Sequence, residues 1–478
     1  MTTGRLAVLT SALTLASFAL PILAGAQPGG SADPAAKGRF LGLQQALETS
    51  LQNHPLVQEA GAGLLASAAR TDQAKSLYYP QIYANADGAA GAARINPRFV
   101  TPAGGLLQPN LSQYTAGLLA SQRIYDFGFT KNLVESSQFG ERAQEQDVSA
   151  RRALVAVNLQ RSYLNSLKRQ RLVRIAEETV RERGTIAGQI ETLYRQQLKS
   201  KLDLDLVRVE LVNAESLLVR ARNDLKASFA ELNRAMGVTG SEDYTLEDIA
   251  TDIRTQRALN DLIADSLAHP ELKRAKEQKS AAEAKKRAMK SQYLPTVSAI
   301  ASGGYYDTFD PTRNVTTGGW WAAGGLVSMP LFTGGLIENQ VKEAAAQEAA
   351  AEAQSTNIEQ ALTQQVTNAY LDTMTFAQQI KLGEELVKTA QEALSLAKQR
   401  YKLGLGTVVE VTQAEVGLTA AQTRLAESQY DYKIAEVTLA YASRGYDPEM
   451  VQLLTRQASG TKPTEPPALL EGTSERKY

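Results

Sequence analysis

The sequence predicts a mainly α-helical protein with a small β part, built from two tandem repeats of helix, strand, strand, long helix and helix. Three observations predict this fold class. Proline is absent from 110–269 and from 331–447, so very long helices can form there. Apolar and small residues recur in alternating steps of four and three, which is the spacing of a coiled coil. The pattern occurs twice, with equivalent residues 207 positions apart, as Tyr194 and Tyr401 are.

The clearest helical pattern runs from Gly334 to Tyr441. The short segment 403–407 separates two apolar runs that share one seam. A repeat of about 3.5 residues held over this length predicts two helices folded into an antiparallel hairpin. The seam residues are Leu362, Val366, Ala369, Thr373, Phe376, Ile380, Gly383, Val387, Ala390, Leu394, Ala397 and Tyr401, then Val411, Ala414, Leu418, Ala421, Leu425, Ser428, Tyr432, Ala435 and Leu439.

Residues 1–26 have the pattern of a signal peptide. Arg5 supplies the positive charge, an apolar run follows, and the small residues Ala24 to Ala26 form a cleavage site. A membrane anchor is the alternative, and the small residues near the end favour cleavage. Residues 27–42 are expected to form a flexible N-terminal tail, because their first part is rich in Gly, Pro and Ala.

The first repeat occupies 43–237. Its opening helix is expected to break at His54, because the proline that follows disfavours helix at that residue, and to stop at Pro80. Strands are expected over about 81–95 and 112–125, because weakly alternating runs there flank a stretch rich in Gly and Pro.

The second repeat, 259–445, has the same order of elements. Its strands are expected over about 296–306 and 318–332, with a loop around Asp310 between them. The opening residues His54 and His269 are 215 positions apart rather than 207, so the first repeat carries an insertion of eight residues, expected in its strand loop. The remaining segments are a linker near mid-height, 238–258, and a flexible C-terminal tail, 446–478.

Each repeat is expected to form a tall rod. The long helices cover about 128–196 and 335–402, and the returning helices cover about 203–236 and 408–441. A helix as long as 128–196 is roughly 100 Å in length. Two half-length helices of about 50 Å each, stacked end to end, match it.

Composition excludes several kinds of protein. The chain has 51 basic and 51 acidic residues and no net charge, so no nucleic-acid partner is expected. It has no cysteine and only two histidines, so no metal site and no other cofactor are expected. No nucleophile–base pair or phosphate loop is present, so we expect no catalytic residues and no enzyme activity.

The strands carry the functional argument. Each chain offers four strands of about ten residues, the length that crosses a bilayer when tilted. Open sheet edges cannot face lipid, and bacterial barrels have at least about eight strands. Several chains must therefore share one barrel. Two chains would give an interior filled by side chains, whereas three would give twelve strands and room for a lumen.

Short motifs occur in both repeats. They are His-Pro, a helix ending in Tyr-x-Pro (Tyr78-Tyr79-Pro80; Tyr293-Leu294-Pro295) and a turn of Ile/Leu-aromatic-x-x-Gly (Ile124 to Gly128; Leu331 to Gly335). A further motif, Arg400 to Gly404, leads into Thr407 to Val411. Together these motifs, which cover about 43–445, resemble the TolC family of outer-membrane efflux ducts.

The resemblance implies a homotrimer, with a twelve-strand β-barrel in the lipid of the outer membrane of a Gram-negative-type bacterium and a twelve-helix α-helical tunnel in the periplasm. It implies a passive, porin-like exit duct of a tripartite efflux pump or a type I secretion system. The implied partners are a periplasmic adaptor protein and an inner-membrane transporter of the RND or ABC class.

The resemblance also implies a periplasmic gate at the hairpin tips. Glu410 and Asp203 are its candidate acidic residues, and Tyr401 and Tyr194 are further candidates. A ring of carboxylates favours cations and can hold a blocking metal ion. Alternatively, an acid just after a helix start caps that helix. We expect capping for Asp203 and a gate role for Glu410, and both tyrosines also fit the seam as packing residues.

The hairpin tips are also the expected docking surface for the adaptor. Gly406 stands where some members of the family have a basic residue that locks the closed tip, and Gln413 where some have a second acid, so we expect the latch to be built differently. The tip residues are Gly404, Leu405, Gly406 and Thr407 in the second repeat, and Leu198, Lys199 and Ser200 in the first.

Aromatic residues gather in the last strand pair. Trp320, Trp321 and Tyr305 are expected at the membrane interface, where aromatic side chains concentrate. Ordinary core packing is the alternative.

A periplasmic coiled-coil structural or adaptor protein is the alternative function. Adaptors have one hairpin followed by β-rich domains. Here the hairpin occurs twice, and glycine-rich strands lie at its opposite end.

Overall fold

The computed structural model describes residues 39–90, 99–100, 106–107, 112–240, 242–249, 253, 257–310 and 313–445. Over these residues the protein is mainly helical with a small β part, as the sequence predicts. The expected signal peptide, most of the N-terminal tail and the C-terminal tail after Gly445 lie outside the described residues.

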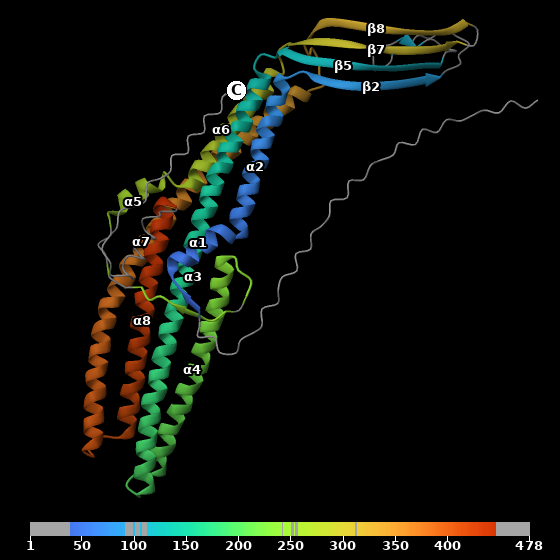
Figure 1. Ribbon diagram of the computed structural model, residues 1–478. Helices are drawn as coiled ribbons and strands as arrows, with labels where there is room; N and C mark the ends of the chain where they lie inside the picture. Colours follow the sequence, from blue (N-terminus) through green and yellow to red (C-terminus); the bar gives the residue numbers. More distant parts are fainter. Residues whose placement is uncertain are drawn as a thin grey trace, which may run out of the picture.

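Long helices make up the body of the molecule (Figure 1). The two longest, α3 and α7, have 67 residues each, which corresponds to about 100 Å. The helices are α1 (Leu43–Asn53), α2 (Pro55–Lys75), α3 (Phe129–Arg195), α4 (Lys201–Met236), α5 (Leu259–Ser266), α6 (Pro270–Ser291), α7 (Leu336–Lys402) and α8 (Val408–Arg444), with a 3-10 turn at Ser76–Tyr78.

The helices begin in the same way in both repeats. His54 and His269 precede a proline at the start of α2 and α6, and each Nδ1 accepts a hydrogen bond of 3.2 Å from the backbone N–H two residues later. Gly128 and Gly335 precede α3 and α7 with φ of 91° and 82°, values that favour glycine. These glycines allow the sharp turn from strand into long helix.

The long helices are each flanked by two half-length helices, as expected. Toward the sheet the packing order is α2, α3, α6, α7, and toward the tips it is α4, α3, α8, α7 (Figure 1). The short helix α5 packs on α7 and α8 near mid-height. Within one chain α3 is therefore an inner helix of both layers, whereas α7 is at the edge of both.

The sheet extends beyond the upper ends of the helices (Figure 1). Its strands are antiparallel, in the order β2, β5, β7, β8, so that β2 and β8 are the edges. The bounds are β2 (Gln81–Ala90), β5 (Ser112–Tyr125), β7 (Thr296–Asp310) and β8 (Arg313–Ser328), and the short strands β3 (Phe99–Val100) and β4 (Leu106–Leu107) pair with each other.

Two strand predictions need correction. We predicted strands over about 296–306 and 318–332, but the β7–β8 ladder continues to Asp310 and Arg313. The added residues contain no glycine, and pairing between the two strands outweighs the low strand propensity of Asp307 and Asp310. Strand β8 then ends at Ser328, before Pro330, which has no N–H to donate. In the first repeat β2 is described only to Ala90, and most of the predicted insertion lies outside the described residues.

A small strap crosses the helices near mid-height. Strand β1 (Arg39–Leu41) pairs in parallel with β6 (Tyr244–Leu246). The Tyr163 hydroxyl, on α3, lies 2.9 Å from the Leu41 carbonyl oxygen and 3.0 Å from that of Glu247, both of which can accept its hydrogen bond. The strap corrects the expected flexible tail up to residue 42 and the expected plain linker over 238–258, because Leu41 and Tyr244 are buried in the main core.

Candidate gate and assembly surfaces

The two hairpin tips have the same turn. Leu198 N–H donates to the Leu193 carbonyl and Leu405 N–H to the Arg400 carbonyl, both at 2.9 Å. The residue before each leucine has a positive φ, 62° at Gln197 and 74° at Gly404. Because Gln197 takes the left-handed conformation without being glycine, the first tip carries backbone strain of about 1 kcal/mol. Leu198 and Leu405 are both about two-thirds exposed, at 66% and 68%.

Asp203 lies in a capping box at the start of α4. Its backbone N–H donates to Ser200 Oγ at 3.1 Å, and its carboxylate accepts from the Ser200 backbone N–H at 3.2 Å. This is the capping contact expected for Asp203, and it stabilises the exposed helix start.

Glu410 occupies the equivalent position on α8. Its backbone N–H donates to Thr407 Oγ1 at 3.3 Å, and its Oε2 is 3.5 Å from Nε of Arg400 on α7. A Cβ at Gly406 would lie 3.1 Å from Glu410 Oε2 and 3.2 Å from Arg400 Cβ. Arg400 therefore occupies the space beside Gly406 and supplies a positive charge next to the Glu410 carboxylate.

A cluster of apolar side chains joins the two hairpins just above the tips. Val408, at the start of α8, is buried with Ile190 of α3 and Leu204 of α4, and Tyr401 packs against them. Nζ of Lys199 lies 4.2 Å from the centre of the Tyr401 ring, a cation–π contact between the hairpins. The Tyr401 hydroxyl has no hydrogen-bond partner among the described residues.

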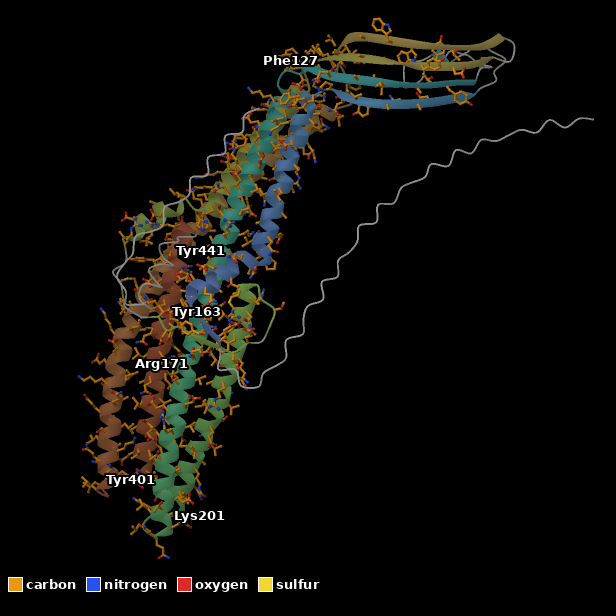
Figure 2. All side chains as sticks on the ribbon, in the orientation of Figure 1. Phe127, Tyr163, Arg171, Lys201, Tyr401 and Tyr441 are labelled. Carbon is orange, nitrogen blue, oxygen red and sulfur yellow. The ribbon has the colours of Figure 1, made fainter. Side chains whose placement is uncertain are left out.

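The two candidate tyrosines have different surroundings, because Tyr401 packs in the cluster between the hairpins. Tyr194, the repeat equivalent of Tyr401, lies on α3 and is 38% exposed. Figure 2 shows Tyr401 and Lys201 at the lower ends of the two hairpins. A cavity of about 640 Å³ opens between the hairpins at this level, lined by residues that include Ile186, Lys199 and Tyr401.

Farther from the tips, where the two hairpins pack together, Glu415 of α8 is buried, with 4% of its surface exposed. Its Oε1 is 3.4 Å from Nζ of Lys398 on α7, and Glu182 and Arg183 of α3 are close enough to affect its titration. Burial raises the pKa of Glu415, and the positive charge of Lys398 opposes that rise.

The first hairpin has the same pair with its charges exchanged. Arg208 is the repeat equivalent of Glu415 and lies 3.5 Å from Glu191, the equivalent of Lys398. Hydrogen bonding to Arg195, and then the charges of Arg195 and Arg208, lower the pKa of Glu191, which is on the surface. Comparing the repeats could have revealed this pair in the sequence, and our sequence analysis missed it.

One face of α7 carries large exposed apolar side chains. Leu371 is 55% exposed, whereas its repeat equivalent on α3, Leu164, is completely buried. The exposed residues are Leu371, Met374, Leu382 and Leu386, and their buried equivalents are Leu164, Leu167, Ile175 and Thr179. We call the four α7 residues the α7 stripe. On α3 the equivalent face packs against α8, where Thr179 Oγ1 lies 3.4 Å from Thr419 Oγ1.

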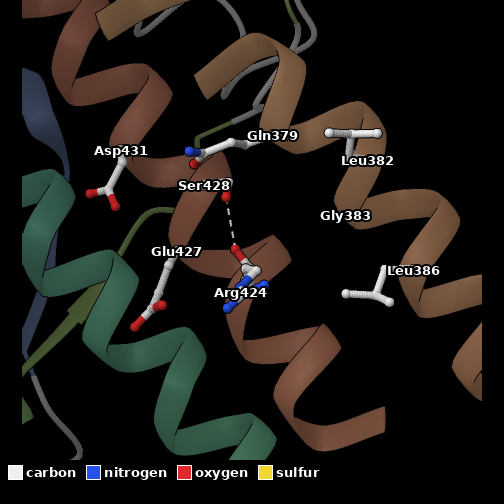
Figure 3. A pocket seen from close by; sticks show the side chains of 8 residues that line it. All are labelled: Gln379, Leu382, Gly383, Leu386, Arg424, Glu427, Ser428 and Asp431. Carbon is white, nitrogen blue, oxygen red and sulfur yellow. Dashed lines mark hydrogen bonds between the residues drawn. The ribbon is translucent and has the colours of Figure 1, made fainter. Parts of the chain in front are cut away.

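Beside the α7 stripe lies a groove of about 450 Å³ between α7 and α8. Figure 3 shows Leu382 and Leu386 on one wall and Arg424, Glu427 and Asp431 on the other. In the wall, Ser428 Oγ donates to the Arg424 carbonyl oxygen at 2.9 Å (Figure 3). The groove therefore has an apolar side and a charged side.

The strand register places the three candidate interface aromatics on two different faces of the sheet. Tyr305 pairs with Gly319 and Gly303 pairs with Trp321, so Tyr305 and Trp321 lie on the same face of the sheet. Trp320 pairs with Gly304 and lies on the opposite face. The alternation of neighbouring residues in a strand could have shown this from the sequence.

Among the residues that the structure describes, no cluster of His, Cys, Asp or Glu is suited to hold a metal ion. None of the described helices is long and apolar enough to span a bilayer.

Comparisons with known proteins agree with this architecture. A family model described as outer membrane efflux protein matches residues 46–238 and 263–443. Over 482 residues the chain is 23% identical to outer membrane protein TolC of Escherichia coli strain K12, which covers 96% of this chain and 92% of that one. It is 24% identical over 368 residues to the probable outer membrane lipoprotein SilC of Salmonella typhimurium, with 72% and 76% covered.

A solved structure shows the same fold. The outer membrane protein VceC of Vibrio cholerae superposes with a TM-score of 0.70 at 20% identity, over 84% of this chain and 96% of that chain. Because the covered shares are large on both sides, the likeness extends over sheet and helices together.

Proposed function

Because this chain belongs to the outer membrane efflux protein family, we propose that three identical copies of it join into one exit duct. The chain is an efflux channel component of the outer membrane of a Gram-negative bacterium. In the proposed trimer, the sheets form a twelve-strand barrel in the membrane and the helices form a twelve-helix tunnel below it. The alternative from the sequence, a periplasmic rod or adaptor, receives no support from the comparisons.

The open sheet supports the sharing of one barrel. Its outermost strands, β2 and β8, each pair on one side only among the described residues. Unpaired backbone N–H and C=O groups cannot face hydrocarbon, so both edges need partners inside a membrane. Pairing β8 of one copy with β2 of the next satisfies both edges, and three copies give twelve strands with room for a lumen.

The α7 stripe supports the same assembly at the level of the helices. On α3 the equivalent face is covered by α8 of the same chain. Helix α4 is the repeat equivalent of α8, so α4 of the next copy is the matching cover for α7. That helix exposes apolar residues of its own, Val212 and Val219, at 61% each. The two surfaces are different, so the contact is head-to-tail, the kind of contact that generates a ring when its rotation closes.

The single observation on which the proposed assembly rests is that equivalent faces of the two long helices differ. The face is buried on α3 and exposed on α7. In particular, Leu386 and Val212 are the equivalents of Thr179 and Thr419, whose side-chain oxygens are 3.4 Å apart within one chain. Leu386 of one copy is therefore expected to lie against Val212 of the next, inside the groove of Figure 3.

We assign the hairpin tips to partner docking and gating. Exposed leucines at both tips, Leu198 and Leu405, offer apolar contacts to a periplasmic adaptor that links the duct to an RND or ABC transporter of the inner membrane. Three copies would bring three Glu410 and three Asp203 carboxylates around the narrow end. The ion pair with Arg400 reduces the charge of the Glu410 ring, and the Lys199–Tyr401 contact supplies the latch.

Cysteine cross-linking tests the assembly, because the natural chain has no cysteine. The double variant Leu386→Cys/Val212→Cys is expected to form disulfides between chains on mild oxidation in cells. A denaturing gel without reductant should show species of one, two and three chains and none larger. A ladder that continues beyond three chains, or no linked species, would contradict the closed trimer.

Two further variants control this experiment. Thr179→Cys/Thr419→Cys has the same geometry within one chain and should give only an internal disulfide. In Leu386→Cys/Asn213→Cys, the second cysteine is the neighbour of Val212 and the equivalent of Ala420, which is exposed on α8. That pair should remain unlinked, and strong linking by it would mean that the contact is not specific.

A further inference from the structure

The two tryptophans are neighbours in β8 but point to opposite sides of the sheet. Trp320 pairs with Gly304 and Trp321 with Gly303, so successive side chains alternate between the two faces. We name the faces after these residues, the Trp320 face and the Trp321 face. A membrane-spanning sheet has one side toward lipid and one toward the lumen, so the two tryptophans cannot share one environment.

The two faces differ in polarity. The middle of the Trp321 face is apolar, with polar Tyr114, Asp307 and Thr317 toward the far end and Gln122 at the helix end. Polar residues occur along the whole Trp320 face. The Trp321 face includes Ile82, Ala84, Ala86, Ala116, Leu118, Ala120, Ala299, Ala301, Tyr305 and Ala323. The Trp320 face includes Gln81, Tyr83, Asn85, Asp87, Thr115, Leu119, Ser121, Ser298, Ile300, Ser302 and Tyr306.

In the inner strands of the sheet, exposure distinguishes the same faces, whereas on the edge strands β2 and β8 residues of both faces are exposed. Along β5, Tyr114, Ala116 and Leu118 on the Trp321 face are exposed, and the residues between them, on the other face, are half-buried. Trp321 itself is 84% exposed, whereas Trp320 is half-buried. A curved sheet covers the side chains of its concave face more than those of its convex face. The Trp320 face is therefore the concave face, which becomes the inside when the sheet closes.

We propose that the Trp320 face lines the lumen of the shared barrel and that Trp320 is a stacking site for flat aromatic cations in transit. The proposal rests on the proposed function. It replaces the expectation that Trp320 lies at the membrane interface, and keeps that expectation for Trp321 and Tyr305.

The surroundings of Trp320 suit such a cargo. In its row across the sheet, the next two positions are Gly304 and Gly117, which carry no side chains that could lie over the indole, and the backbones of their strands approach closely there, so that a Cβ on Gly304 would meet the Ala116 carbonyl oxygen. In the next row toward the far end of the strands, Tyr306 on the neighbouring strand adds a second aromatic ring, and Asp87, on the opposite edge strand β2, adds a negative charge to the same face. A tryptophan ring attracts a cation over its face. A carboxylate on the same wall favours cations in the lumen in general.

Fluorescence quenching tests the position of Trp320, because the chain has only two tryptophans. In Trp321→Phe the remaining Trp320 should be quenched by acrylamide in water and spared by brominated phospholipid in reconstituted vesicles. In Trp320→Phe the remaining Trp321 should show the opposite pattern. Quenching of Trp320 by the brominated lipid would overturn its placement in the lumen.

Binding of ethidium, a flat aromatic cation, tests the stacking site. Fluorescence anisotropy of ethidium added to the detergent-solubilised full chain should give a dissociation constant about fivefold weaker for Trp320→Ala than for the unaltered chain. The matched variant Trp321→Ala should bind as the unaltered chain does. Equal affinity with and without Trp320 overturns this inference, even where the cysteine pair links three chains. Failure of that linking contradicts the proposed function instead.

Discussion

The two helical hairpins have the same seam but different surroundings. Helix α3 is enclosed by α2, α4, α6 and α8, and the strap crosses it at Tyr163. Helix α7 lies at the edge of the chain, and its equivalent of Tyr163, Tyr370, is not covered by a strap strand in the part of the chain that the structure describes. The same pattern of apolar residues is thus a core in one repeat and a surface in the other. An uncovered copy of the core face is what the proposed contact with another copy requires.

The largest expected effect comes from shortening equivalent leucines on the two long helices. Leu164→Ala should reduce the free energy of unfolding by about 2–5 kcal/mol, because it opens a cavity in the main core. Leu371→Ala should leave the unfolding of a separated subunit within about 0.5 kcal/mol, because that side chain is exposed there. Urea denaturation followed by circular dichroism measures both.

The same pair of variants also tests assembly. Leu371→Ala should lower the temperature at which the proposed trimer dissociates on a native gel, because the lost methyl groups belong to the proposed contact between copies. If Leu371→Ala destabilised the separated subunit as much as Leu164→Ala does, the two faces would not differ as proposed.

The sequence predicted the helices well and the strap poorly, for physical reasons. Helices of 67 residues repeat their apolar pattern many times and each begins directly after a glycine, so their ends could be placed within a few residues. A strand of three residues, such as Arg39–Leu41, has no detectable period. Its structure depends on the distant partner Tyr244–Leu246, which only the folded chain brings alongside.

Among the site residues, too, local contacts could be predicted from the sequence and contacts between distant segments could not. The caps made by Ser200 and Thr407 are local, and their spacing to the acid three positions later is visible in the sequence. The contact of Lys199 with Tyr401 joins two hairpins, so no local pattern reveals it. The buried position of Glu415 likewise depends on the packing of α3 against α8.

The contact between Lys199 of the first tip and Tyr401 of the second hairpin can be tested directly. Lys199→Met keeps the aliphatic stem and removes the charge over the Tyr401 ring, a loss of about 0.5–1 kcal/mol. If the contact holds the tips closed, the ratio of open to closed channels should rise about twofold to fivefold in planar bilayers. Tyr401→Phe should leave that ratio unchanged, since the hydroxyl has no partner among the described residues. An equal rise with Tyr401→Phe would assign the latch to the hydroxyl.

The smallest expected effect is a pH dependence that has opposite signs in the two hairpins. Burial raises the pKa of Glu415 above its ordinary value of 4.5, so the folded state binds the proton more readily than the unfolded state does. The ionised carboxylate therefore costs stability at neutral pH, and that cost is relieved as the pH falls through the raised pKa toward 4.5. Glu415→Gln should remove this gain, seen as a flatter dependence of the urea midpoint on pH.

Glu191 provides the matched test in the other hairpin. Its pKa is lowered by Arg195 and Arg208, so its contribution is present above 4.5 and is lost as the pH falls through the lowered pKa. Because Glu191 is partly exposed and solvent screens its ion pairs, Glu191→Gln should change the urea midpoint by less than Glu415→Gln does and in the opposite direction on acidification. If the urea midpoints of the two variants changed in parallel with pH, the exchange of charges between the repeats would have no effect on how stability depends on pH. Opposed profiles would show that each hairpin responds to acid in its own way, although their seams are alike.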